Sequence, residues 1–286
     1  SQLLQRLSMD ASTGGDAHSL NTPDEHALAH ALGLPMADGQ IPWAALHAQQ
    51  HLPAWQTSSA WAFISLCHWQ VLSDQIVMRH WPITDLSPEH SHALLSSMQP
   101  YFAEDGITLH PDRPGHWVAE GACLGQLLSA NPERALGRGL RPWMPGGAAA
   151  PVLKRLQNEM QMLLHTHHVN EERHAQNQII VNSFWVHGSG TLPTGFVWPA
   201  DKPVVEHRLR EPALAQDWTA WAQAWKAIDA TAMADLCKAL NQGQKVQLTL
   251  SGERHAQRWH TQAQSPWHRL RSRLFPKPVI QALESL

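Results

Sequence analysis

Apolar residues recur at helical spacing in several segments of the chain. This pattern predicts helices over 1–9, 22–33, 87–102 and 151–168, and a mostly helical segment over 213–241. The helix over 151–168 has the clearest amphipathic pattern. Its predicted apolar face consists of Leu153, Leu156, Met160, Leu163 and Leu164.

Short runs of β-branched and aromatic residues lie between these helices and predict buried strands. The predicted strands cover 61–69, 75–79, 108–110, 116–119, 179–185 and 246–250. Helices that alternate with short buried strands favour an α/β fold, with a mixed sheet flanked by helices.

One segment, 137–150, is rich in Gly, Pro and Ala and predicts a long loop. We expect this loop to separate an N-terminal α/β part (1–136) from a C-terminal α/β part (151–265) of the same globular unit. A short basic tail (266–286) follows.

Composition and charge exclude several classes of function. Apolar residues make up 43% of the 286 residues, which is enough for a substantial core. A net charge of −3 with only 16% charged residues gives no field that would draw the chain to nucleic acid. No apolar run reaches the roughly 18 to 20 residues of a membrane span. The three cysteines form no CxxC pair, so we expect a reducing, cytoplasmic location.

The densest polar cluster lies between Gln157 and Arg173. Gln157, Gln161 and His165 follow one another at a spacing of four residues, so they share one stripe of a helix. Amides and one Arg suit a polar or anionic ligand, although a solvated helix face has the same pattern. The candidate ligand-binding residues, from here and from two strand ends, are His68, Trp69, Asp74, Gln157, Asn158, Gln161, His165, Asn170, Arg173, Asn182, Ser183 and Trp185.

Catalytic and metal motifs are weak. The twenty His residues include His165-Thr166-His167-His168, but no HExxH helix occurs. His68 could act as a base oriented by Asp74, and it could equally be a hydrogen-bonded structural residue. No GxSxG elbow, P-loop or GxGxxG fingerprint is present. We therefore expect no catalytic residues, no metal ligands and no cofactor.

Three longer stretches resemble a known family. The segments 66–75 (LCHWQVLSDQ), 155–173 (RLQNEMQMLLHTHHVNEER) and 181–193 (VNSFWVHGSGTLP) look like the RpfE-type regulatory proteins of proteobacteria, and the resemblance covers most of residues 20–260. Members of this family are often labelled cofactor-independent phosphoglycerate mutase.

The mutase label also has a counterpart in the sequence. Residues 182–190 are similar to a stretch of archaeal-type mutases of the alkaline phosphatase superfamily, and 246–255 resembles the last core strand of those enzymes. The resemblance implies metal ligands Asp-His after that strand, where this chain has Glu253-Arg254. Because Arg254 is a cation, the resemblance implies a related fold with an eroded metal centre. We expect the strand that carries the first Asp of the mutase to precede Ser1.

Three functional hypotheses follow. The leading one is a noncatalytic regulatory protein that senses a small anionic metabolite on a mutase-like scaffold. The alternative is a phosphoglycerate mutase-like phosphotransferase or phosphohydrolase with an altered metal site. A third is an interaction protein that docks a protein partner through its Trp-rich surface or its basic tail. The basic residues named for that tail are Arg269, Arg271, Arg273 and Lys277.

Overall fold

The computed structural model describes residues 2–53, 55, 58–81 and 83–261. The chain forms two compact units. Within the described residues, one unit combines 2–17 and 23–28 with 200–261, and the other comprises 18–22 and 29–199. The predicted long loop 137–150 lies within the second unit, and the predicted tail lies outside the described residues.

The second unit is built on a five-stranded sheet in which β2 is central. β2 pairs with β5 and β8 along its first half and with β3 near its end, and β5 also pairs with β4. Every one of these pairs is antiparallel, so the sheet is not mixed in strand direction. The strands are β2 (Trp61–Val71), β3 (Ile76–His80), β4 (Thr108–Arg113), β5 (His116–Glu120) and β8 (Ser183–Gly190).

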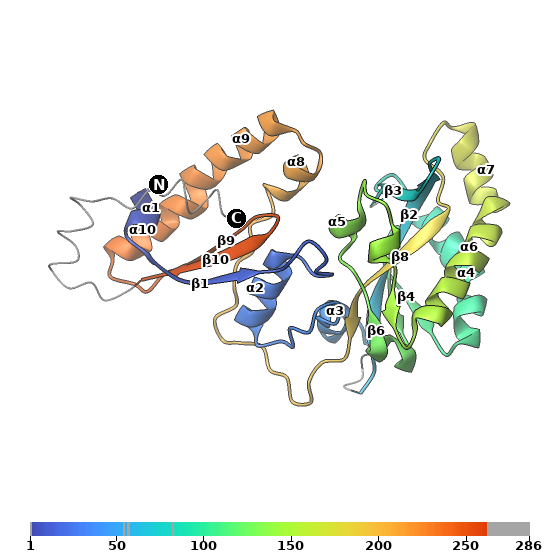
Figure 1. Ribbon diagram of the computed structural model, residues 1–286, viewed down its shortest axis with the longest axis horizontal. Helices are drawn as coiled ribbons and strands as arrows, with labels where there is room; N and C mark the ends of the chain where they lie inside the picture. The colour runs from blue at the N-terminus through green and yellow to red at the C-terminus, as the bar shows by residue number, and fades with distance from the viewer. Residues whose placement is uncertain (1, 54, 56–57, 82, 262–286) are drawn as a thin grey trace. The chain divides into compact units, whose positions relative to one another are not determined.

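Helices α4 (Pro88–Glu104) and α6 (Ala150–His165) cover one face of this sheet (Figure 1). Their apolar stripes bury against alternate residues of β2, and each large side chain buried in this way contributes about 1.5–3 kcal/mol. Ser87 caps α4 by accepting a hydrogen bond from the His90 N–H. The core between helices and sheet includes Ile64, Leu66, Leu94, Met98, Phe102, Leu153, Leu156, Met160 and Leu164.

The opposite face of the sheet carries α3 (Trp43–His51) and the chain between β5 and α6. This stretch includes the predicted loop 137–150, in which Leu140 and Trp143 are buried against Trp69 and Trp185. The loop is therefore a packed part of the unit. Its short elements are η1 (Ala122–Gln126), β6 (Leu127–Leu128), α5 (Pro132–Ala135), η2 (Arg141–Trp143) and β7 (Gly146–Gly147).

The first unit has its own three-stranded sheet with the order β1-β10-β9. Its apolar core includes Leu3, Leu4, Leu7 and Trp259, with Leu236 and other residues of α10 packed against them. The elements are α1 (Gln2–Gln5), β1 (Ser8–Gly14), α8 (Arg210–Leu214), α9 (Trp218–Ile228), a π-helical turn (Asp229–Met233), α10 (Ala234–Asn241), β9 (Gln247–Ser251) and β10 (His255–His260). Helix α2 (Pro23–Leu32) contributes residues to both units.

The predicted α/β class is confirmed, with four local corrections. Residues 8–14 form β1 instead of a helix end and a break, because they pair with β10. Residues 168–175 form a separate helix, α7 (His168–Ala175), which the sequence pattern did not predict because most of its residues are polar. β8 begins at Ser183, after the predicted start of its strand. β9, expected to be a core strand, belongs to the sheet of the first unit.

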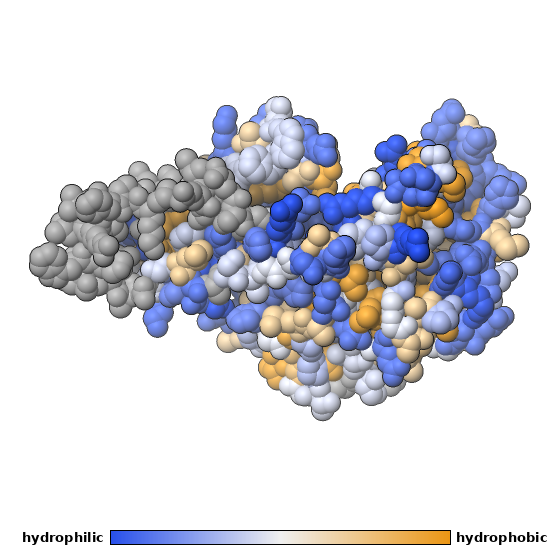
Figure 2. All heavy atoms as spheres, viewed as in Figure 1, coloured by the Kyte–Doolittle hydropathy of each residue, from blue (hydrophilic) through white to orange (hydrophobic). Residues whose placement is uncertain are grey.

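One face of the molecule can be compared for polar and apolar residues. Figure 2 shows hydrophilic residues over much of the visible face, interrupted by smaller hydrophobic patches. Among the described residues, no helix combines the length and the apolar character needed to cross a bilayer.

Candidate functional site

Several predicted site residues gather around the segment that leads into β8. Asn182 pairs with the backbone of Trp69 on β2: its Oδ1 accepts from the Trp69 N–H at 2.7 Å, and its Nδ2 donates to the Trp69 carbonyl at 2.8 Å. His68 lies beside them, with Nδ1 3.0 Å from the Ile180 carbonyl. These contacts fasten residues 180–182 to the end of β2.

Asn170 on α7 fastens the same segment from the other side. Its Nδ2 donates to the carbonyls of Leu164 and Val181 at 2.8 and 2.6 Å, and its Oδ1 accepts from the Val181 N–H at 2.8 Å. The side chain is 5% exposed, so its amide satisfies backbone groups that water does not reach.

Arg173 was expected to bind an anion, and the structure gives its guanidinium other partners. The side chain is fully buried. Its Nε donates to the Ile179 carbonyl at 2.6 Å, and one terminal nitrogen donates to Asp85 Oδ1 at 2.7 Å. The half-exposed Asp85 carboxylate thus stands where an anionic ligand was predicted.

The other predicted residues are divided between the core and the surface. Trp69 is buried, and so is Trp185, whose Nε1 donates to the Ala130 carbonyl at 2.9 Å. Gln157 is buried under β8, and its Oε1 and the Ser183 hydroxyl have no hydrogen-bond partner within the described part of the chain. The exposed or half-exposed residues are Asp74, Asn158, Gln161 and His165. A ligand-binding role for this region stays a prediction.

The His-rich segment after α6 also has a structural role. His167 caps α7 by accepting from the Val169 N–H, and its Nε2 lies 3.0 Å from the Ser97 hydroxyl of α4. Its ring stacks on His168. Burial, together with the neighbouring His168, lowers the pKa of His167. Within the described ranges, no group of three His, Cys, Asp or Glu residues could hold a metal ion.

A second polar region, absent from the sequence predictions, lies on the other face of the sheet. We call it the imidazole cluster: His47, Asp112, His116 and His187 around the ring of Phe63. Asp112 Oδ1 lies 3.0 Å from His47 Nε2, and its Oδ2 lies 3.3 Å from His116 Nδ1. The ring centroid of Phe63 is 5.5, 4.9 and 5.2 Å from those of His47, His116 and His187.

Strand register assembles this cluster. Phe63 pairs with His187 on β8, and Ser65 pairs with His116 on β5, so these side chains share the face opposite Ile64. The Ser65 hydroxyl lies 2.9 Å from His187 Nε2. α3 supplies His47. Helical spacing and strand alternation were readable from the sequence, but the pairing that brings these strands together was not.

The electrostatics of the cluster disfavour a charged His116. Its pKa is lowered from 6.5 to about 4, mainly by burial and also by the nearby Arg113, while Asp112 partly opposes the shift. The side chain is only 7% exposed, so desolvation of an imidazolium outweighs the attraction of one carboxylate. His116 is therefore neutral at physiological pH.

The turn between β4 and β5 connects this cluster with a surface pocket of about 210 Å³. Gly115 has a positive φ of 72°, which favours glycine and allows the chain to reverse tightly after Pro114. Arg113 and His92 provide the basic groups of the pocket. It is lined by Pro88, Ser91, His92, Leu95, Pro111, Asp112, Arg113, Pro114 and Trp117, and we call it the hairpin pocket.

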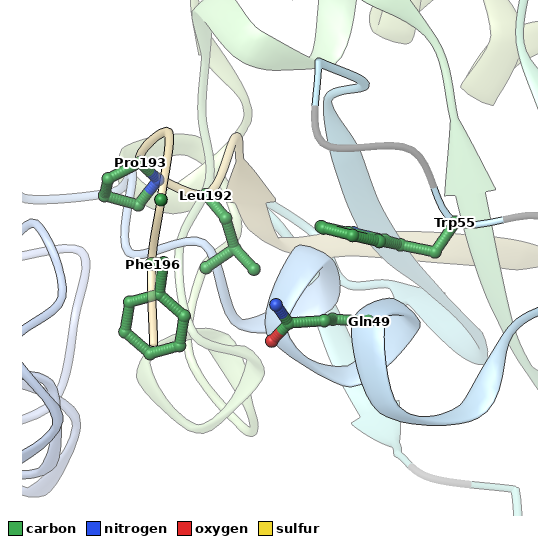
Figure 3. A pocket seen from close by; sticks show the side chains of 6 residues that line it. Gln49, Trp55, Leu192, Pro193 and Phe196 are labelled. Atoms are coloured by element: carbon green, nitrogen blue, oxygen red, sulfur yellow. The ribbon is translucent and has the colours of Figure 1, made fainter. Parts of the chain in front are cut away.

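A smaller pocket, of about 120 Å³, lies between α3 and the segment after β8. Figure 3 shows the Leu192 side chain and the Gln49 amide between the rings of Phe196 and Trp55. Gln49 Oε1 already accepts a hydrogen bond from Trp198 Nε1 at 3.1 Å. Its lining contains no charged side chain, so this pocket offers nothing that would select an anion.

Glu253 and Arg254, where the sequence resemblance implied metal ligands, lie in the turn between β9 and β10. Both are exposed. The strand that precedes them belongs to the three-stranded sheet of the first unit, whereas β8 belongs to the sheet of the second.

Comparisons with known proteins give distant structural similarity only. No protein-family model and no curated protein matches the chain. Among solved structures, the chain is similar to a cofactor-independent phosphoglycerate mutase from Thermoplasma acidophilum DSM 1728, with 14% identity, a TM-score of 0.41, and coverage of 87% of this chain and 80% of that one. It is also similar to the PH0037 protein from Pyrococcus horikoshii, with 12% identity, a TM-score of 0.32, and coverage of 66% and 42%. Neither similarity assigns a function to this chain.

Proposed function

We propose that this protein is a noncatalytic regulatory protein that senses a small anionic ligand, and that the ligand binds in the hairpin pocket. The observation that carries the proposal is the placement of Arg113 and His92 on the walls of one pocket. Both side chains are exposed, and neither forms an ion pair or a side-chain hydrogen bond within the described ranges. A guanidinium in this state can bind an incoming carboxylate or phosphate at two points.

The contrast with Arg173 supports this choice of site. To bind an anion, Arg173 would have to release Asp85 and the Ile179 carbonyl, and those groups would lose their partner. Arg113 would not have to release a partner in order to bind an anion. The predicted amide-rich region therefore supports the framework of the protein, and the ligand site is proposed at a different edge of the same sheet.

We further propose that the scaffold is a mutase-like, reduced alkaline-phosphatase-type core whose metal centre is eroded. Support comes from the sequence likeness of residues 182–190, which include all of β8. It also comes from Arg254, a cation at a position where the resemblance implies a metal ligand.

A thermal-shift screen with inorganic phosphate, phosphorylated metabolites and small carboxylates at millimolar concentration tests the proposal. A ligand at 100 times its Kd stabilises the folded state by about 2.7 kcal/mol, which gives a measurable rise in Tm. We expect Arg113→Gln to abolish the shift and the matched surface variant Arg141→Gln to retain it. No shift with any anion would overturn the proposed sensor.

Turnover assays test the noncatalytic part separately. The purified chain is supplied with Mg²⁺, Mn²⁺ or Zn²⁺ and with 2- or 3-phosphoglycerate or a generic phosphomonoester. We expect no metal-dependent product above the buffer control. Metal-dependent product above the buffer control would overturn the noncatalytic part of the proposal and would favour the phosphotransferase alternative.

A further inference from the structure

Part of the wall of the hairpin pocket is apolar and rigid. Pro88, Pro111 and Pro114 have φ fixed by their rings, and Trp117 is fully buried, so these surfaces change little when a ligand arrives. With a volume of about 210 Å³, the pocket is smaller than the roughly 300–1,000 Å³ of sites for drug-sized ligands. It suits a compact, flat apolar group, such as a single ring.

Ser91 adds a buried polar group to this lining. Its hydroxyl accepts hydrogen bonds from the Gly115 N–H and from Trp117 Nε1, both at 3.0 Å. A hydroxyl has two acceptor lone pairs and one proton to donate. Because these contacts use both lone pairs and the side chain is only 6% exposed, its proton is the group left to meet an acceptor atom of a ligand.

Charge in the pocket favours a monoanion. Arg113 attracts negative charge, whereas Asp112 on the same wall repels it. A hydrogen bond with His47 holds one oxygen of the Asp112 carboxylate at the imidazole cluster, and the other oxygen lies 3.3 Å from His116 Nδ1. A ligand with one negative charge can therefore bind beside Arg113. A phosphate ester, with two negative charges at neutral pH, would be repelled more strongly by Asp112.

We propose that the hairpin pocket binds a monoanionic carboxylate carried on a flat apolar ring, that is, a small aromatic carboxylic acid. This inference rests on the proposed anion-sensing function and names its ligand class. Arg113 binds the carboxylate, the Ser91 hydroxyl donates to it, and the ring packs against the proline side chains and Leu95. Specificity over acetate comes from burial of the ring, and specificity over phosphate comes from Asp112.

Isothermal titration calorimetry of the full chain with benzoate, acetate and inorganic phosphate at pH 7 tests this inference. We expect benzoate to bind at least about tenfold more tightly than acetate, because burial of the ring adds apolar contact. Arg113→Gln should weaken benzoate binding by about tenfold or more, since it removes a charge-assisted hydrogen bond. Arg141→Gln, the matched control, should bind benzoate as the wild type does.

The other outcomes separate this inference from the function on which it rests. Phosphate binding that depends on Arg113, without benzoate binding, would overturn the ligand class and leave the anion sensor standing. Benzoate binding that is equal in Arg113→Gln and wild type would overturn the pocket as its site. No binding of any of the three anions would overturn both proposals.

Discussion

The amide-rich region around β8 and the hairpin pocket both contain polar side chains beside the same sheet, and they differ in what those side chains contact. Asn170, Arg173 and Asn182 bind backbone groups of neighbouring segments at 2.6–2.8 Å. Arg113 and His92 border a pocket instead. A dense polar cluster in a sequence can therefore serve to hold backbone segments together. In this protein the more accessible charge is that of Arg113, in the short turn between β4 and β5.

The largest effect is expected for Asn170→Ala. This change leaves the Leu164 carbonyl and both backbone groups of Val181 without their partner in a buried site. At about 1 kcal/mol for each lost hydrogen bond, the free energy of unfolding should fall by about 3 kcal/mol. Urea denaturation measures it. The exposed Asn158→Ala on α6 is the control and should stay within about 0.5 kcal/mol of wild type. Equal values for the two variants would show that Asn170 is not part of the framework.

A pH effect of similar size is expected from His116. Its pKa is about 4 in the folded state and 6.5 when it is unfolded, so the unfolded chain binds an additional proton between these values. Stability should therefore fall as the pH drops from about 6.5 towards 4, by on the order of 3 kcal/mol from this residue.

Urea midpoints of wild type and His116→Gln across that pH range isolate this contribution. The variant lacks the titrating ring and should show a flatter dependence on pH, whatever its stability at pH 7. Parallel curves for the two proteins would mean that the imidazole cluster does not resist protonation at His116.

The two arginines give the most direct comparison of the regions. Arg173→Met keeps the aliphatic stem and removes the donors to Ile179 and Asp85, so we expect a loss of about 2 kcal/mol. The loss is limited because the half-exposed Asp85 can be solvated. Chemical denaturation measures this change in the free energy of unfolding. A change near zero would mean that Arg173 is again a candidate for ligand binding.

The smallest effect is expected for Arg113→Met. Because this side chain is exposed and makes no ion pair within the described ranges, stability without ligand should change by less than about 0.5 kcal/mol. The same denaturation experiment gives the value. A loss comparable to that of Arg173→Met would show that Arg113 also belongs to the framework.

Periodicity in the sequence predicted much of the second unit. The buried faces of α4 and α6 follow the predicted apolar stripes, and β2 to β5 lie close to their predicted positions. These elements were readable because each face is defined by local spacing. α7 was not, because its buried residues are mainly Asn170 and Arg173, which do not register as an apolar stripe.

The site was less readable because it depends on pairing between distant strands. His116 and His187 meet only because β5 and β8 both pair with β2. The sequence analysis placed Asn182 and Ser183 among candidate ligand-binding residues, and that role stays a prediction. The sequence could not show whether an amide side chain bonds to the backbone or is available to a ligand. The answer depends on which backbone carbonyls the fold places near that amide.

The pairing of β1 with β10 has a consequence for the order of assembly during synthesis. Ser8 leaves the ribosome long before its partner His260, because residues 9–259 are made between them. Residues 29–199 can condense while the first strand still has an unpaired edge, which is the kind of edge that invites association with other chains. The first unit therefore closes after residues 29–199 can fold, and chaperone protection during translation would matter most for β1.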